Sequence, residues 1–199
     1  CGPMQSTTLS FANMHNHGEL FANVLRARRE SFILRNRWDL PETMGMEFDQ
    51  YDTPLSRWLA VHDASGRVLA GVRLTPTTAR CGVYSYMIRD AQRGLLDSIP
   101  SDLLHREAPV AEGVWEVTRG FVAHDVPAAI RHKVRMRLVM QMLRTSREEG
   151  IRTMLALLPV GWGRWAARCA LEMKAAGREM DMGGILYQAV WIDFSGQLH

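Results

Sequence analysis

The amino-acid sequence predicts an α/β domain in which helices cover a mixed central sheet. Patterns typical of strand, helix, strand, helix and strand follow one another through the second half of the 199-residue chain, an order that favours a layered domain. Residues 151–160 are almost all apolar, as expected for a strand that is buried on both faces. With 47% hydrophobic residues, the chain can build a substantial core.

The first half of the chain is predicted to contain strands, a long helix and an acidic loop. In order, they are a strand at 7–14, a helix at 19–36, the loop at 39–54, and strands at 56–63 and 68–77. Apolar residues at helical spacing indicate the helix, and the turn at 64–67 between the last two strands suits a hairpin. Residues 80–109 give an ambiguous pattern and are expected to contain short helices.

The second half is predicted to alternate strictly between strand and helix. In order, it holds a strand at 114–124, a helix at 127–149, a strand at 151–160, a helix at 162–176 and a strand at 184–194. Pro127 suits the first turn of a helix, whereas Gly150 and Gly177 are typical residues to end one.

The composition favours a reduced, cytoplasmic setting. Cys1, Cys81 and Cys169 are too few for a disulfide framework, and none are paired at metal-ligand spacing, so no metal is expected. No apolar run approaches the ~18 residues of a membrane span, and the N-terminus lacks the pattern of a secretory signal. Residues 1–3 resemble a cloning remnant, which leaves residues 4–199 as a single domain. The net charge of +3 favours acidic partners.

Residues 47–52 and Arg73 form the first candidate site. The loop carries Glu47, Asp49 and Asp52 with two aromatic residues between them, so it could receive a cation. A metal fits less well because hard-cation loops usually carry more oxygen ligands and a glycine for the bend. A solvated acidic loop is the simpler alternative. Arg73 lies in an apolar strand and needs a partner, either this loop or solvent at a strand edge.

A second candidate lies in the strand at 114–124, where Glu116 and Arg119 are predicted to point to opposite faces. Burial raises the pKa of a glutamate toward the range of a general base. An arginine can hold a carboxylate through a two-pronged contact. A structural ion pair is the competing interpretation for Arg119, and a weaker one for Glu116.

Two further features concern helices. Arg28 and Phe32 lie one turn apart and Trp38 follows the helix, so cation–π attraction could bind a sulfonium ion there, although core packing also explains these aromatics. The helix at 127–149 carries a basic run that could dock an acidic protein, face solvent or contact nucleic acid. The last option is disfavoured because no aromatics are interleaved. This run comprises Arg131, Lys133, Arg135, Arg137, Arg144 and Arg147.

Taken in order, these motifs resemble those of the LuxI-type acyl-homoserine-lactone synthases. The resemblance implies a three-layer sandwich with a mixed central sheet, like that of the Gcn5-related N-acetyltransferases. It implies a cytoplasmic enzyme of quorum sensing that acylates S-adenosylmethionine with a thioester of acyl carrier protein or coenzyme A. The product then closes to a lactone and releases methylthioadenosine. S-adenosylmethionine is a co-substrate, and no tightly bound cofactor, nucleic acid or membrane span is expected.

The resemblance also assigns roles to residues. Glu116 would be the base, and Arg119 or Arg28 would position a carboxylate. The S-adenosylmethionine side would comprise Arg28, Phe32, Trp38, Asp49, Asp52 and Arg73. The acyl pocket would contain Thr118, Ala156 and Leu158, and carrier-protein docking would use Arg131, Lys133, Arg135 and Arg137. Thr118 stands where serine is common, and Ala156 where many members that prefer 3-oxo chains have threonine, which weakens the case for a 3-oxo substrate.

Two alternatives remain open. The first is an N-acyltransferase of the same fold that uses acyl-coenzyme A and a different amine. Against it, residues 122–134 contain no glycine for the phosphate-binding loop of that family. The second is a non-catalytic module that binds acidic proteins through the basic helix, which leaves the carboxylates and apolar-strand arginines unexplained.

Overall fold

The computed structural model describes residues 3–193, and the chain divides into two units. The first unit comprises residues up to Leu74 together with Arg119–Met142, and the second comprises Thr75–Thr118 together with residues from Leu143 onward. The expected single domain over residues 4–199 stays a prediction. Cys1 and Gly2 of the expected cloning remnant, and Phe194 of the last predicted strand, lie outside the described residues.

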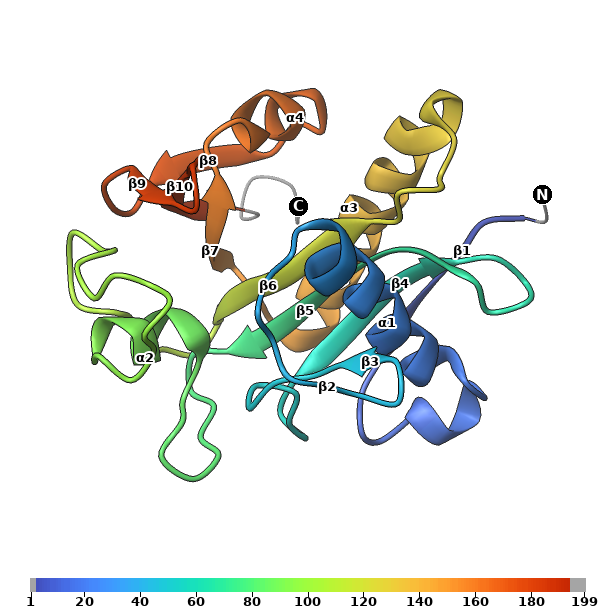
Figure 1. Ribbon diagram of the computed structural model, residues 1–199, viewed down its shortest axis with the longest axis horizontal. Coiled ribbons are helices and arrows are strands. Elements are labelled where there is room, and N and C mark those ends of the chain that lie inside the picture. Colours follow the sequence, from blue (N-terminus) through green and yellow to red (C-terminus); the bar gives the residue numbers. More distant parts are fainter. Residues whose placement is uncertain (1–2, 194–199) are drawn as a thin grey trace. The chain divides into compact units, whose positions relative to one another are not determined.

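The first unit contains an antiparallel set of strands in the order β1, β4, β5 (Figure 1). The bounds are β1 Gln5–Leu9, β4 Arg57–His62 and β5 Val68–Pro76. Before β4 come a 3-10 turn η1 (Met14–Asn16), helix α1 (Leu20–Arg28), a π-helical extension η2 (Arg29–Arg35) and the hairpin β2 (Glu42–Thr43) and β3 (Met46–Glu47). The predicted helix at 19–36 and the strands at 56–63 and 68–77 are therefore confirmed. The strand predicted at 7–14 is wrong beyond Leu9, because residues 11–13 form a turn and η1 follows. The loop at 39–54 also contains a short hairpin.

Apolar side chains of α1 and the strands form the core of this unit. Leu20 and Val24 are one turn apart, so both reach the same cluster, which also contains Trp58 and Phe121. Gly71 makes this packing possible, because a Cβ there would lie 2.9 Å from the Phe121 ring. A larger residue would force the ring away from β5.

The second unit carries the mixed part of the sheet. Strand β6 (Val114–Val122) begins in this unit and pairs in parallel with β7 (Thr153–Pro159) over four positions, Val114↔Thr153 to Val117↔Ala156. Strand β10 (Ile185–Asp193) is antiparallel to β7, β8 (Glu172–Ala175) and β9 (Met180–Met182). Its helices include α2 (Met87–Gln92) and α4 (Trp162–Arg168), and α3 (Ala128–Glu149) passes from the first unit into the second. The predicted mixed sheet is confirmed.

The predicted helix at 162–176 is wrong beyond Arg168. Ala170 has a left-handed φ of 57°, which ends the helix, and residues Glu172–Ala175 then pair with β10. Backbone hydrogen bonds to β10, which become available only in the folded chain, outweigh the local preference for helix. Gly177 does not end a helix: a Cβ at this position would overlap the carbonyl oxygen of Leu103.

Across residues 3–193, none of the helices combines the length and apolar character needed to cross a membrane.

Candidate active site

Three arginines of the first unit converge on the acidic loop that leads from β3 to β4. Arg28, the last residue of α1, donates from Nε and Nη2 to both oxygens of Glu47, at 2.9 and 2.8 Å. Its Nη1 and Nη2 also donate to both oxygens of Asp52, at 2.7 and 2.9 Å. Paired contacts between a guanidinium and a carboxylate are strong and directional. Arg28 therefore ties the end of the helix to both ends of the loop.

Arg73 and Arg119 complete the arrangement. Arg73 on β5 donates to both oxygens of Asp49 and lies 3.1 Å from an oxygen of Asp52. Arg119 on β6 donates to Glu47 and to Asp49, each at 2.9 Å. Each arginine thus contacts two carboxylates, and each carboxylate contacts two arginines. We call this closed set the arginine–carboxylate ring; its members are Arg28, Glu47, Arg119, Asp49, Arg73 and Asp52.

The ring is enclosed and its formal charges cancel. Arg28, Glu47 and Arg73 are each no more than 1% exposed. Burial would raise the pKa of Asp52, but Arg73 and Arg28 hold that pKa well below its usual range. Burial also opposes ionisation of Asp49, whose pKa is nevertheless lowered by Arg73 and Arg119. Both carboxyl groups are therefore ionised at neutral pH, and the ring is a set of full charges.

Burial acts differently on two of the arginines. Burial lowers the pKa of Arg119, and the attraction of the nearby Asp49 only partly offsets this effect. For Arg28 the attraction of Asp52 and its hydrogen bonds outweigh burial, so the pKa is raised. Both guanidinium groups stay charged, because the ordinary value lies far above neutral pH.

Aromatic rings lie beside the Arg119 side chain. Phe32 stacks on Trp38 with ring centres 5.0 Å apart, and Phe121 meets Phe32 edge-on at 6.0 Å. The Arg119 guanidinium lies 5.7 Å from the Phe32 ring centre. Phe32 is buried and Trp38 half-buried. The chain reversal after η2 brings the two aromatics together: Arg37 has a left-handed φ of 57°, and the amide of Trp38 donates to the carbonyl of Phe32 at 2.8 Å.

Arg119 has an unusual backbone. Its φ is 55°, in the left-handed region that strand residues rarely adopt. This conformation interrupts the regular alternation of side chains along β6 at that point. Such strained positions are frequent at functional sites, where the surrounding contacts hold them. The contacts to Glu47 and Asp49 are such a restraint.

The ring shows which of the alternatives for the acidic loop is correct. Arg28, Asp49, Asp52 and Arg73 contact one another, so the loop is neither solvated nor a metal site formed by the loop alone. Glu47, which belongs to the candidate loop but was given no role on the S-adenosylmethionine side, joins them, whereas Phe121 was not predicted. The glutamate stands in the recognised acidic motif, and Phe121 follows Arg119 by two positions, so both signals were present in the sequence.

Glu116 lies in the second unit, where it is fully buried. Its carboxylate oxygens accept hydrogen bonds from the backbone amides of Met87 at 3.2 Å and Ile88 at 2.6 Å. These amides belong to the first turn of α2, which lacks internal partners for them. Glu116 therefore anchors this helix, and its predicted role as a base stays a prediction.

The other side chains around the start of α2 are also engaged. Asp90 accepts from the amide and the hydroxyl of Ser85 at 2.9 and 2.6 Å. The hydroxyl of Tyr86 donates to the carbonyl of Pro109 at 2.5 Å. Burial, reinforced by the charge of Glu116, raises the pKa of Tyr86 far above its usual value. Tyr86 is therefore a neutral donor at physiological pH.

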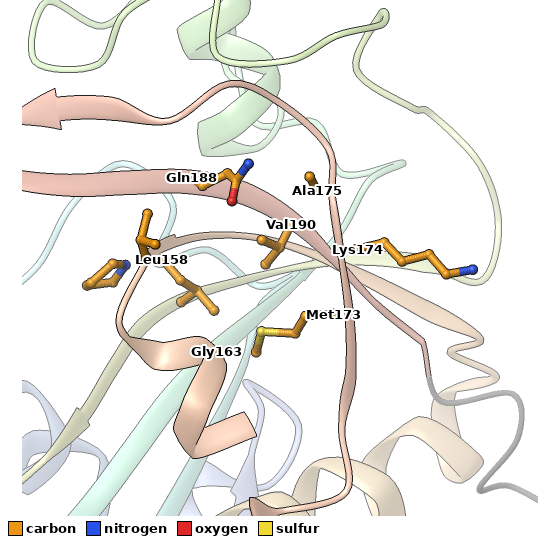
Figure 2. A pocket seen from close by; sticks show the side chains of 9 residues that line it. Leu158, Gly163, Met173, Lys174, Ala175, Gln188 and Val190 are labelled. Atoms are coloured by element: carbon orange, nitrogen blue, oxygen red, sulfur yellow. The ribbon is translucent and has the colours of Figure 1, made fainter. Parts of the chain in front are cut away.

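The residues predicted for an acyl pocket also lie in the second unit. Thr118 and Ala156 are buried on β6 and β7. Leu158, two positions after Ala156, lines a pocket of about 190 Å³, shown in Figure 2. Thr118 and Ala156 do not border this space.

The predicted docking residues on the basic helix α3 differ in how exposed they are. Arg131 donates to the carbonyl of Ala123 at 3.0 Å and is half-buried, so it supports the turn before the helix. Arg135 is also half-buried. Lys133 and Arg137, one turn apart, are both exposed. These two are best placed to meet a partner.

Comparison with known proteins gives a consistent family. The model of the autoinducer synthase family matches residues 12–196. An acyl-homoserine-lactone synthase of Vibrio anguillarum is 30% identical over 110 residues, covering 55% of this chain and 51% of that relative, about half of its length. Another from Ralstonia nicotianae is 29% identical over 173 residues, covering 83% of this chain and 78% of the relative.

The fold agrees as well. A solved coenzyme-A-dependent acyl-homoserine lactone synthase, with S-adenosylmethionine and isopentyl-coenzyme A, has a TM-score of 0.78 at 20% identity, over 98% of this chain and 86% of that chain. At this identity the likeness shows a shared fold and confirms the predicted α/β class. The curated relatives confirm the expected class of enzyme, an acyltransferase. Since the family model matches nearly the whole sequence, the chain belongs to the autoinducer synthase family.

Proposed function

We propose that this protein acylates S-adenosylmethionine with an acyl thioester and then closes the product to an acyl-homoserine lactone. The observation that carries the proposal is the arginine–carboxylate ring with its neighbouring aromatics, built from the residues that the sequence resemblance singled out. The related structure solved with S-adenosylmethionine and an acyl-coenzyme A supports both substrates.

The arginine–carboxylate ring has a structural role, because it holds the elements around the site in place. Its carboxylates are saturated by arginines, so a sulfonium substrate would have to break buried ion pairs to reach them. We infer that the ring fixes α1, the acidic loop and β6, and that the substrate lies beside it. Trp38 offers a half-buried aromatic face for the sulfonium, and Arg119, 7% exposed, offers a guanidinium edge for the substrate carboxylate.

The chemistry has two steps. The amine of S-adenosylmethionine attacks the thioester carbonyl, the thiol departs, and a base removes the proton of the amine. Glu116 is the proposed base, directly or through water. The substrate carboxylate then attacks the γ-carbon, and the carbon–sulfur bond breaks with its electron pair leaving on methylthioadenosine. Arg119 would position this carboxylate, because the step needs alignment more than activation.

One assay tests the reaction. Purified protein is incubated with S-adenosylmethionine and acyl thioesters of carrier protein and of coenzyme A, and products are identified by mass spectrometry. The proposal expects equal amounts of methylthioadenosine and acyl lactone. Absence of methylthioadenosine with every donor would refute it. Acylation of a different amine would instead indicate the N-acyltransferase alternative.

We further propose that acyl carrier protein is the donor and that α3 docks it. Lys133 and Arg137 present positive charge on one exposed face, and Met140, 60% exposed, continues that face one turn later. Reversing both charges to glutamate should raise KM for carrier-protein donors about tenfold or more and leave coenzyme A donors within about twofold. Arg106→Glu, an exposed site in the second unit, is the matched control. An equal effect on both donors would argue against docking.

A further inference from the structure

The second unit contains an apolar pocket over the sheet formed by β7, β10 and β8. Its volume is about 190 Å³. Gln188 lies opposite Leu158, and Val190 lies opposite both Ala156 and Ala175. Because paired residues and those two apart share a face, these side chains and Met173 lie on one face of the sheet, and all of them except Ala156 line the pocket.

Two of the residues that line this pocket, Gln188 and Lys174, have polar side chains. The amide of Gln188 donates to the carbonyl of Gly177 at 2.9 Å. Figure 2 shows Lys174 extending away from the space around which Leu158, Val190 and Met173 lie. Most of the other lining side chains, such as Leu158, Val190 and Met173, are aliphatic or thioether, which suits an unbranched hydrocarbon.

Met173 stands at the far side of this pocket from β6. The hydrogen-bonded order in this unit is β6, β7, β10, β8, and neighbouring strands lie about 4.8 Å apart. Leu158 on β7 and Met173 on β8 therefore bound the pocket at opposite sides. Met173 is half-buried, and its unbranched thioether can adapt to the end of a flexible chain.

We propose that Met173 sets the acyl-chain length that this protein accepts, and that the pocket holds a tail of about six to eight carbons. A cavity of about 150 Å³ is known to hold benzene, with six carbons, so a pocket of 190 Å³ holds slightly more. This inference rests on the proposed function, since it identifies the tail as that of the acyl donor. It adds a length limit that neither Thr118 nor Ala156 supplies.

The test is a chain-length profile for the whole protein with straight-chain donors from butanoyl to tetradecanoyl. For the wild type, kcat/KM should rise about fourfold per methylene up to about octanoyl and fall at dodecanoyl. Met173→Ala should move the optimum about two carbons longer, and Met173→Phe should move it shorter. Met173→Leu, which nearly keeps the volume, should keep the optimum within one carbon. Met173→Val, a smaller truncation that should also move the optimum longer, replaces the alanine variant if that variant does not fold.

Met182→Ala is the matched control. Met182 is also a half-buried strand methionine of the second unit, but it packs against the core cluster around Tyr86 and does not border the pocket. Its optimum should equal that of the wild type. Identical optima for the alanine and phenylalanine variants at Met173 would overturn the inference, as would a wild-type rate still rising at dodecanoyl.

A binding measurement separates this inference from the proposed function. Unreactive S-alkyl coenzyme A thioethers of graded length are titrated into the protein by calorimetry, without turnover. An affinity maximum near eight carbons that moves in Met173→Ala supports the length limit even if no lactone forms, in which case only the proposed function fails. Affinity that does not depend on chain length overturns the inference.

Discussion

Truncation of Arg28 tests whether the arginine–carboxylate ring stabilises the first unit. Arg28→Ala removes four hydrogen bonds and leaves Glu47 and Asp52 each with one arginine partner. The ring then holds two arginines against three carboxylates in a site that water scarcely reaches. Removing one partner of a buried ion pair costs about 3 to 5 kcal/mol.

The neighbouring residue supplies the control. Arg29 pairs with Glu42 at 2.9 Å, almost the same distance, but the two side chains are 30% and 39% exposed. Exposed pairs contribute about 0 to 1 kcal/mol because solvent screens them. Arg29→Ala should therefore cost far less than Arg28→Ala.

Urea unfolding distinguishes the two variants. With m near 2.5 kcal/mol per molar, the midpoint should fall by about 1 to 2 M for Arg28→Ala and by less than about 0.4 M for Arg29→Ala. Arg28→Lys should lie between them, because a lysine keeps the charge but not the paired geometry. Equal midpoints for the two alanine variants would refute the ring as a source of stability.

Three further predictions follow from single residues. Asp49 and Asp52 have lowered pKa values in the folded protein, so their ionised forms stabilise the fold at pH values above their unfolded pKa of about 4. The urea midpoint should therefore fall as the pH drops below about 4, and it should fall less steeply in Asp52→Asn. Glu116→Gln should lower kcat at least about a hundredfold, whereas Asp90→Asn, which loosens the same helix start, should stay within about tenfold; similar losses would make Glu116 only structural. Arg119→Gly should have a free energy of unfolding about 1 kcal/mol higher than that of Arg119→Ala, and so a higher urea midpoint, because glycine accepts a φ of 55° without strain. A lower midpoint for the glycine variant would contradict this strain.

Local patterns in the sequence predicted most elements. The hairpin of β4 and β5 and the strand β6 have strand-like patterns, and the long helix α3 has Pro127 before its start and Gly150 after its end. These elements were correct within a few positions. The segment Glu172–Ala175 was not, because its pairing with β10 depends on a strand that lies later in the chain. Local preference carries no information about such a partner.

The sequence by itself determined the family and singled out the candidate site residues. Charged residues are costly inside apolar strands, and this is why the sequence pointed to Arg73, Glu116 and Arg119. The acidic loop was recognised from its three carboxylates. Only the tertiary structure decided how they are used. It closed the loop into a ring of alternating charges, set Glu116 against the amides of α2, and gave Arg119 its left-handed backbone. These outcomes depend on which groups meet across 19 to 72 residues of chain, as with Arg28 or Arg119 and Glu47, and only folding brings them together.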